Sequence, residues 1–428
     1  MRWIGDGASL RLTALLLFMA PASAALSGDA EKGRAIFLGQ AGAVRSDAAQ
    51  DRLSRLPCMS CHGRDGLGGR EGRVPPIDGP NLARATADRP SYDARRFAAA
   101  VTEGHAAGGR TLSRLMPRYD LHASEAEDLF AWLRLLPQAQ RRGVTADRIA
   151  IGLANMSHLH DPSGARYREI LERSMRDRLG GPQVHGRRIE LITVEAGVSA
   201  EDLDILACLA LPRTAMTPFL DAGIPVLFPL GQLTGDEDPT LVRDFLPSAR
   251  DARRSLAKRI AVSTDGPVAV VPAGPEADAL ALALNLAGAD LDDAPGPNTR
   301  ELVILDAEAV PEALAAAPEA RLWIGGSALT RLRGVPNERS AVAVIEMSTL
   351  LDMRGDGETS LIQAHARLAG AILADVLVEA GRDLTHAKLV RAFGSTWLGE
   401  LKLDFSAIPL TGTDRLQFVE LPERRRHN

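Results

Sequence analysis

The sequence predicts an all-α domain over residues 25–140, followed by an α/β domain with parallel sheets over residues 145–428. Two amphipathic helical segments flank the first stretch. Beyond it, short apolar runs alternate with amphipathic helices, a pattern typical of parallel α/β sheets. The polar segment 138–143 interrupts both patterns, so we place the linker between the two domains there.

Residues 1–24 have the pattern of a cleaved secretory signal peptide. Arg2 and Arg11 precede an apolar run over residues 12–20, and residues 22–24 have the small-x-small pattern of a signal peptidase site. The run is too short to serve as a permanent membrane span. We therefore expect a periplasmic protein with no membrane span after cleavage.

The composition is that of an ordinary globular protein of two or three domains. The chain has 428 residues, of which 45% are hydrophobic and 25% charged, and its formal net charge is −5. No Gly-x-Gly-x-x-Gly or Walker pattern opens a helix, so nucleotide binding has no support, and no nucleic-acid partner is expected.

The first domain begins and ends with a predicted helix. Residues 29–37 form the first one, in which the small Gly33 lets another helix approach closely. The last helix is predicted to start with Ser124 as its N-cap, and Glu127 three residues on would complete a capping box. Its apolar residues recur at helical spacing until Pro137, which we expect to end the helix.

The five residues from Cys58 to His62 read CMSCH, which in an exported protein is typical of a c-type haem attachment site. Two thiols one helical turn apart, Cys58 and Cys61, can bond the two vinyl groups of one porphyrin. His62 would then lie beside the iron as its proximal ligand. We therefore expect one covalent haem c.

Two other functions of this cysteine pair fit less well. A structural zinc site would need two more ligands at matching spacing, but the third cysteine, Cys208, stands alone in an apolar run. A thioredoxin-like redox pair would lie between a strand and a helix, whereas Pro57 and the Gly-rich segment 63–69 flank this one.

The second axial ligand of the haem iron is expected to be Met116, which lies in a loop just before the last predicted helix. A thioether is a usual partner of histidine in this class of site. Met59 lies inside the attachment motif and cannot reach the opposite face of the haem. His105 and His122 remain alternatives.

Residues 28–136 resemble a class I cytochrome c. The resemblance rests on the opening Gly-Asp-Ala-x-x-Gly-x-x-x-Phe, the attachment motif, the segment 75–82, the pair Met116-Pro117 and the closing helix. Residues 104–119 are particularly similar to cytochrome subunits that accept electrons from periplasmic quinoprotein dehydrogenases. The resemblance implies an electron carrier with a redox partner protein, such as a quinoprotein dehydrogenase or a terminal oxidase.

In the second domain, buried strands alternate with helices. One helix is predicted with Tyr167, Ile170, Leu171, Met175 and Leu179 on one face, ending at Gly180-Gly181. The predicted strands are residues 149–153, 189–194, 205–211, 225–228, 268–271, 302–305, 322–324 and 342–345.

These pieces resemble, in order, the type I periplasmic binding proteins, specifically the substrate-binding proteins of the branched-chain amino acid and amide group of ABC transporters. Residues 152–181 are similar to their first strand, ligand loop and first helix. Residues 186–191 are similar to the second strand, residues 222–227 to an Ala-Gly-Val-Pro-Val strand, and residues 380–390 to the closing helix pair. The implied fold has two lobes, each a parallel sheet flanked by helices, with a hinged cleft between them.

The chain is shorter than these binding proteins at two places that line the ligand cleft in the family. Only about eight residues separate Val194 from Leu203, where the family has a whole helix, and the second lobe is short. If a small molecule binds, Ser163 and Thr214 are the matching polar positions. His158, His160 and Asp161 lie in the same loop as Ser163, and we interpret them as solvated side chains rather than a metal site.

Two functional hypotheses follow. The first is a periplasmic mono-haem cytochrome that carries electrons, with a binding-protein-like module for docking or for sensing a small molecule. The alternative is a solute-binding protein of an ABC importer or receptor with an accessory haem domain. Peroxidase-type catalysis would need an open iron site, which Met116 would fill, so no enzymatic activity is expected.

Overall fold

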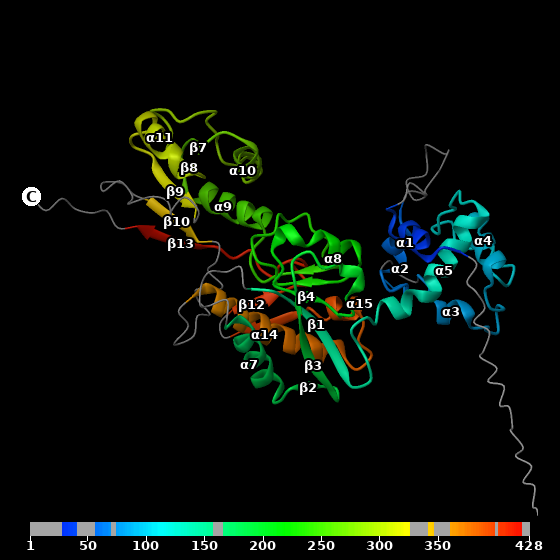
Figure 1. Ribbon diagram of the computed structural model, residues 1–428. Coiled ribbons are helices and arrows are strands. Elements are labelled where there is room, and N and C mark those ends of the chain that lie inside the picture. Colours follow the sequence, from blue (N-terminus) through cyan, green and yellow to red (C-terminus); the bar gives the residue numbers. More distant parts are fainter. Residues whose placement is uncertain are drawn as a thin grey trace, which may run out of the picture. The chain divides into compact units, whose positions relative to one another are not determined.

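The computed structural model describes residues 28–40, 56–69, 74–156, 166–325, 341–345, 360–398 and 401–421. The chain divides into two compact units, Met1–Leu136 and Pro137–Asn428. Figure 1 shows that the described part of the first unit is helical, whereas the second unit combines helices with sheets. The predicted signal peptide lies outside the described residues.

The helical unit is built from short helices around one apolar core. The core side chains include Phe37, Leu82, Phe97, Leu129 and Leu133, all nearly inaccessible to solvent. The helices are α1 (Ala30–Leu38), α2 (Cys58–His62), α3 (Gly79–Ala83), α4 (Ala94–Thr102) and α5 (Ala123–Ala139).

Helices α1 and α5 meet at Gly33, because only a glycine fits there. A Cβ atom on Gly33 would lie 1.9 Å from the backbone oxygen of Asp128. The start of α1 is also tied to α5, since the Asp29 backbone N–H donates to the Asp128 carboxylate at 2.6 Å. The structure therefore confirms the prediction that Gly33 lets another helix approach closely.

Both predicted ends of α5 are wrong by a few residues. The helix starts at Ala123, and the Glu125 carboxylate accepts a hydrogen bond from the His122 backbone N–H at 2.7 Å. The reciprocal cap is therefore two residues earlier than the Ser124–Glu127 box. Pro137 lies inside the helix, which continues to Ala139.

The α/β unit contains two main sheets. The first has the strand order β2-β3-β1-β4-β5-β6, in which β2 is antiparallel to β3 and all other neighbours are parallel. Its strands are β1 (Arg148–Ala154), β2 (Gln183–Val184), β3 (Arg187–Val194), β4 (Cys208–Leu209), β5 (Val226–Leu227) and β6 (Val242–Arg243).

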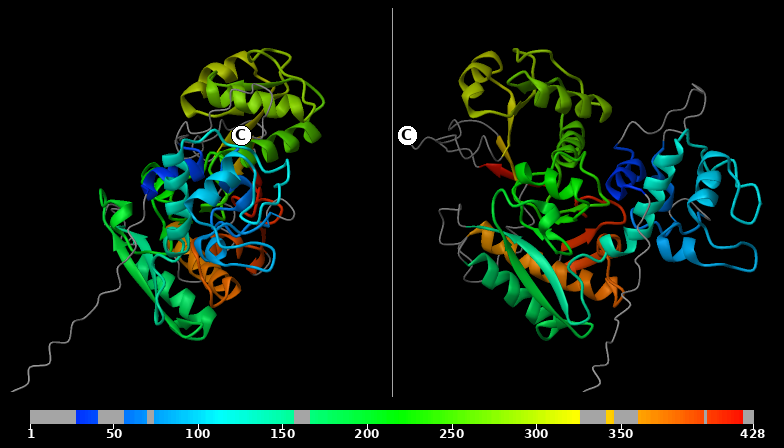
Figure 2. Two further views of the ribbon diagram at one scale, coloured as in Figure 1. Left: turned by 90° about the vertical axis from the view of Figure 1, so that its right-hand side faces the viewer. Right: turned by 45° about the vertical axis from the view of Figure 1, so that its right-hand side comes forward.

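Two long helices, α7 (Tyr167–Leu179) and α14 (Leu361–Ala380), lie side by side against the first sheet (Figure 2). They approach closely at Gly370, where a Cβ atom would lie 2.5 Å from the backbone oxygen of Leu171. Among the described residues, α14 alone has the length and apolar composition to cross a membrane, but 67% of its most apolar window is buried. Core packing therefore accounts for its composition.

The connection from β3 to β4 is short, as predicted. It contains only the 3-10 turn η2 (Ala200–Asp202) in place of a helix. The Arg142 side chain donates to the backbone oxygens of Ala200, Glu201 and Leu203, which fixes the turn. Two further short elements, η3 (Arg213–Ala215) and α8 (Thr217–Asp221), follow β4.

The second sheet has the strand order β13-β10-β9-β8-β7, with only β13 antiparallel to its neighbour. Its strands are β7 (Val268–Val271), β8 (Glu301–Ile304), β9 (Arg321–Gly325), β10 (Ala341–Ile345) and β13 (Gln417–Leu421). The helices α9 (Ala249–Ser263), α10 (Pro275–Leu286) and α11 (Val310–Ala316) and the turn η4 (Ala307–Ala309) belong to it.

The chain passes between the two sheets three times. It leaves the first sheet through α9, returns in α14 and α15 (His386–Arg391), and leaves again after the hairpin β11 (Ser395–Leu398) and β12 (Leu401–Asp404) to form β13. The result is a two-lobed α/β unit with mostly parallel sheets, which is the architecture predicted for this part of the chain.

Candidate functional site

The carboxyl edge of the first sheet is the place where an open parallel sheet binds ligands. Thr214 lies there, on the turn that follows β4, and its side chain is exposed. Ser163, its predicted partner, and the group His158 to Asp161 lie outside the described residues. Asn155 follows β1, and its amide donates to the Glu195 carboxylate at 2.6 Å.

Two residues at this edge have an unusual backbone. Ala210 directly follows β4 with φ 55°, and Phe228 directly follows β5 with φ 52°. The left-handed conformation costs a non-glycine residue roughly 1–2 kcal/mol, and such residues concentrate at functional sites. The bend at Ala210 comes just before the segment with Thr214, and the bend at Phe228 comes just before Leu230. The backbones of these two segments are hydrogen-bonded: the Arg213 N–H donates to the Leu230 carbonyl, and the Leu230 N–H donates to the Leu211 carbonyl.

A buried polar group lies in the first lobe, where α7, α14 and the end of β6 meet. The Tyr167 hydroxyl is 2.7 Å from Nδ1 of His365. The Asp244 carboxyl is fully buried, and its Oδ1 accepts a hydrogen bond from the Phe245 backbone N–H at 2.8 Å. Among the described residues, Nε2 of His365 and Oδ2 of Asp244 have no hydrogen-bond partner.

Burial sets the protonation of this group. It raises the pKa of Asp244 to about 8, because desolvation disfavours the carboxylate more than the Phe245 backbone N–H stabilises it. It lowers the pKa of His365 to about 4, although the nearby Pro229 carbonyl acts in the opposite direction. At neutral pH the group is therefore uncharged. No local sequence pattern signals it, since Tyr167 and His365 are 198 residues apart.

In the helical unit, α2 carries all three residues of the predicted haem attachment site. Cys58 and His62 are buried, Cys61 is partly buried, and both cysteines are free thiols. Nδ1 of His62 lies 2.9 Å from the Pro75 carbonyl oxygen, to which it would donate as N–H. Burial lowers the pKa of His62, and the neutral tautomer with its proton on Nδ1 leaves Nε2 as the free lone pair.

Met116 is partly buried and packs against the same apolar cluster as Cys58. Its loop is fixed by Arg118, whose guanidinium donates to the backbone oxygens of Met116 and Leu112. Of the alternatives, His105 is exposed and paired with Glu103 at 3.3 Å, and His122 is exposed at the start of α5.

Two further observations concern metals and thiols. The described residues contain no group of three or more His, Cys, Asp or Glu side chains that could hold a metal ion. Cys208 is fully buried in β4, and burial raises the pKa of its thiol to about 12, so it is held as an unreactive thiol.

Several solved structures resemble this chain. An ABC transporter substrate-binding protein from Desulfitobacterium hafniense, in complex with Leu, has 17% identity and a TM-score of 0.47, covering 65% of this chain and 99% of its own. A fatty acid ABC transporter substrate-binding protein from Thermomonospora curvata has 12% identity and a TM-score of 0.45, covering 67% of this chain and 91% of its own. A substrate-binding periplasmic protein from Ralstonia solanacearum has 16% identity and a TM-score of 0.41, covering 64% of this chain and 97% of its own.

No protein-family model and no curated relative matches the chain. Leu and fatty acid, the ligands named for the first two proteins, are theirs, and the fold of the α/β unit follows from its own strand order. The structural neighbours are substrate-binding proteins and not enzymes.

The interpretation of this chain as an electron carrier is wrong. The structures that it resembles are ABC transporter substrate-binding proteins, and cytochrome and electron-transfer properties find no support among them. A redox partner such as a quinoprotein dehydrogenase or terminal oxidase is likewise unsupported.

Proposed function

We propose that this chain is an extracytoplasmic solute-binding protein of an ABC importer or receptor. The single observation that carries the proposal is the carboxyl edge of the first sheet. There, two left-handed residues, Ala210 and Phe228, end neighbouring parallel strands and lead into the segment that exposes Thr214. Backbone strain at the ligand edge of a parallel sheet favours a binding function.

The chemistry of this edge suits a small polar solute. The Thr214 hydroxyl can donate and accept a hydrogen bond. Backbone groups freed where β4 and β5 end can add to it, as the loops of open α/β sheets commonly do. Ser163 belongs to this proposal as a second polar contact, since its loop follows β1 in the sequence. An amino acid is the first solute to test.

The test is a thermal melt of the full chain against a panel of amino acids, amides and short carboxylic acids. A ligand at one hundred times its Kd stabilises the native state by about 2.7 kcal/mol, which should raise the Tm of the α/β unit by several degrees. Thr214→Ala should reduce the shift. Thr86→Ala, an exposed threonine of the helical unit, serves as the matched control. No saturable shift with any member of the panel would contradict the proposal.

We further propose that the helical unit, which resembles a class I cytochrome c, carries one covalent haem c as an accessory group. The residues fit it: Cys58 and Cys61 for attachment, His62 with Nδ1 held by Pro75, and Met116 in the same apolar cluster. When bound, haem would supply a redox-active iron, and His62 and Met116 are the side chains that would hold it. The chain's own contribution is to keep His62 neutral and oriented.

The proposed location is the periplasm, after cleavage of residues 1–24. Both the signal-peptide pattern and a solute-binding function favour it.

A further inference from the structure

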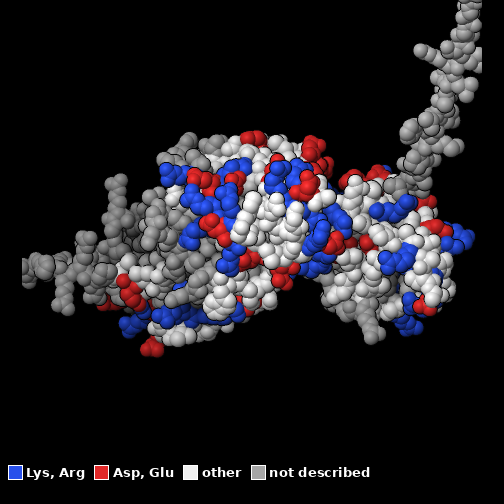
Figure 3. All heavy atoms as spheres, turned by 90° about the horizontal axis from the view of Figure 1, so that it is seen from below, with Lys and Arg blue, Asp and Glu red and all other residues white. Residues whose placement is uncertain are grey.

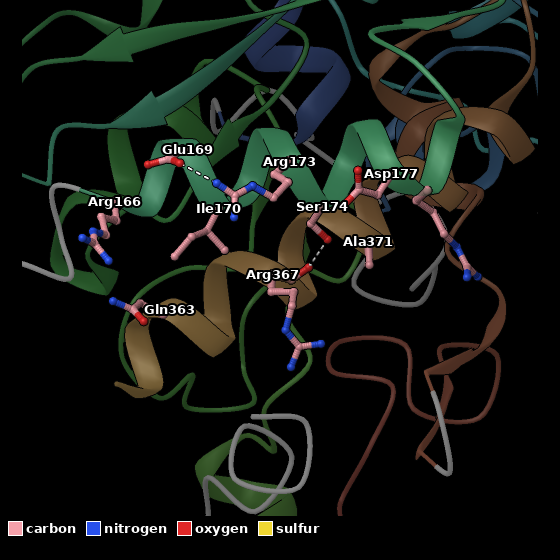
Figure 4. Close-up of a pocket in the computed structure, with 10 residues that line it drawn as sticks. Arg166, Glu169, Ile170, Arg173, Ser174, Asp177, Gln363, Arg367 and Ala371 are labelled. Atoms are coloured by element: carbon pink, nitrogen blue, oxygen red, sulfur yellow. Dashed lines mark hydrogen bonds and ion pairs between the residues drawn. The ribbon is translucent and has the colours of Figure 1, made fainter. Parts of the chain in front are cut away.

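The surface between α7 and α14 carries a charge pattern that is complementary to itself. A groove of about 730 Å³ lies between these helices. Arg166, which directly precedes α7, and Glu169, Arg173 and Asp177 on α7 line it along one stripe (Figure 4). Their spacing of three or four residues keeps them on one helix face. All four side chains are exposed, and their signs alternate along the stripe.

Two contacts join α7 to α14 along the groove. Arg178 makes a two-fold ion pair with Asp375, with nitrogen–oxygen distances of 2.7 and 2.8 Å. The backbone oxygen of Arg367 accepts a hydrogen bond from the Ser174 hydroxyl at 2.7 Å, as Figure 4 shows. The stripe on α7 adds exposed charges of both signs to this surface.

Within the stripe, the two inner charges pair with each other. Arg173 lies 2.5 Å from Glu169, and both side chains are more than 60% exposed. Arg166 and Asp177, one of each sign, make no ion pair with any described residue. A positive charge thus ends the stripe on one side and a negative charge on the other.

We propose that a second copy of this chain docks on this groove, with the two α7 helices antiparallel across a two-fold axis. The pair Arg166 and Asp177 and the pair Glu169 and Arg173 are both centred on α7 beside Leu171, to within half a residue. A two-fold axis at that point places each charge opposite the other sign on the second copy. A two-fold contact requires such a self-complementary surface.

The centre of the stripe permits a close approach. Ile170 and Ser174 on α7 and Ala371 on α14 lie beside the axis and are partly buried. Around it, two copies of Glu169 and Arg173 would form a network of four alternating charges, which contributes more than isolated surface pairs. Figure 3, a view of the molecule from below, shows basic and acidic side chains interspersed over the described part of the α/β unit.

The interface is small, so the dimer is transient. Helix α7 has 13 residues and is about 20 Å long. Two helices side by side present a face of roughly 20 by 20 Å, or about 800 Å² buried in total, which is typical of weak encounters. Because exposed charges dominate it, its affinity should fall steeply with salt.

Sedimentation equilibrium of the full chain over a concentration series tests the proposal. We expect the dissociation constant of the dimer to rise at least tenfold between roughly 0.05 and 0.5 M salt. Arg173→Glu places four acidic side chains around the axis, and Glu169→Arg places four basic ones there. Each should weaken the dimer at least tenfold at low salt. Lys258→Glu, an equal change of charge on α9, should leave the constant unchanged.

Mixing the two variants gives the decisive result. An equimolar mixture of Arg173→Glu and Glu169→Arg chains should associate at least tenfold more tightly than either variant alone, because every facing pair is then of opposite sign. The double variant Glu169→Arg/Arg173→Glu should recover the wild-type constant. A monomeric wild-type chain at all concentrations, or a mixture no tighter than its components, would overturn the proposal. Circular dichroism of each variant checks that it is folded. None of these outcomes depends on solute binding.

Discussion

The hydroxyl of Tyr167 lies 2.7 Å from Nδ1 of His365, and this hydrogen bond joins α7 to α14 in the interior of the first lobe. Both side chains are buried, and their rings are 5.8 Å apart. Burial raises the pKa of Tyr167 and lowers that of His365, so neither group is charged at neutral pH. The contact is thus a neutral hydrogen bond between two buried side chains of these helices.

Tyr167→Phe should destabilise the α/β unit by about 1–3 kcal/mol, because Nδ1 of His365 would be left buried without a partner. Urea unfolding measures the change. Tyr92→Phe is the matched control, since the Tyr92 ring contacts Arg89 at 5.0 Å and keeps that contact without its hydroxyl. Equal effects of the two substitutions would contradict the role of the Tyr167–His365 bond. The double variant Tyr167→Phe/His365→Phe should recover part of the loss, since both polar groups are then removed.

Asp244 should make the α/β unit less stable as pH rises toward 8. Its pKa is 3.8 in the unfolded chain and about 8 in the folded one. Between these values the folded carboxyl keeps a proton that the unfolded one has lost, so the free energy of unfolding falls by up to about 1.4 kcal/mol per pH unit. Asp244→Asn should remove this fall, as measured by urea unfolding at pH 6.5 to 8. Exposed Asp265→Asn should retain the wild-type profile.

Two buried histidines act in the opposite direction on the acid side. Burial lowers the pKa of His365 and of His386 from 6.5 to about 4. Their unfolded forms bind protons between these values and their folded forms do not, so the free energy of unfolding falls as pH drops from 6.5 to 4. His386→Gln should reduce the dependence of the unfolding free energy on pH between 4 and 6.5 by up to about 1.4 kcal/mol per pH unit, which is the effect of one proton. His185→Gln, at an exposed histidine, should leave this dependence unchanged. A profile unchanged by His386→Gln would refute the assignment.

The order of strands and helices could be predicted where an apolar run is long and uninterrupted. Residues 268–271 and 302–305 are such runs, and they coincide with β7 and with most of β8. The run 205–211 predicted a longer strand than β4, which pairs only at Cys208 and Leu209. The left-handed backbone of Ala210 ends the strand after Leu209, and an alanine gives no sequence signal for a positive φ.

The candidate sites were predictable only where their residues are close in sequence. The α2 motif and Thr214 are local, and the structure places them on a helix and at a sheet edge. The buried Tyr167, His365 and Asp244 come from segments that only the chain's return in α14 brings together. Tyr167 was correctly predicted on the buried face of its helix, but nothing in the sequence indicated its polar partner.

Covalent haem should depend on α2 and its ligation on the loop before α5. Cys58→Ser/Cys61→Ser should abolish haem that survives denaturation, as measured by haem staining of a denaturing gel. Met116→Ala should keep the covalent haem and change the absorption spectrum of its iron, because the thioether ligand is lost. Met59→Ala is the control, since Met59 lies within the attachment helix. If Met59→Ala changes the spectrum and Met116→Ala does not, the ligand assignment is wrong.

Gly370→Ala should destabilise the first lobe even though alanine is the better helix former by about 1 kcal/mol. The new methyl group would lie 2.5 Å from the Leu171 backbone oxygen and 2.9 Å from Cβ of Ser174, so α7 and α14 must move apart. Overpacking of this kind costs roughly 1–3 kcal/mol, which exceeds the gain in helix propensity. The hydrogen bond from Ser174 to the Arg367 backbone oxygen, 2.7 Å long, would weaken with the separation. Gly181→Ala is the matched control, because a Cβ atom there meets nothing within 4 Å. Urea unfolding of both variants gives the comparison, and a Gly370→Ala chain at least as stable as the wild type would show that the helices are not in contact at this point.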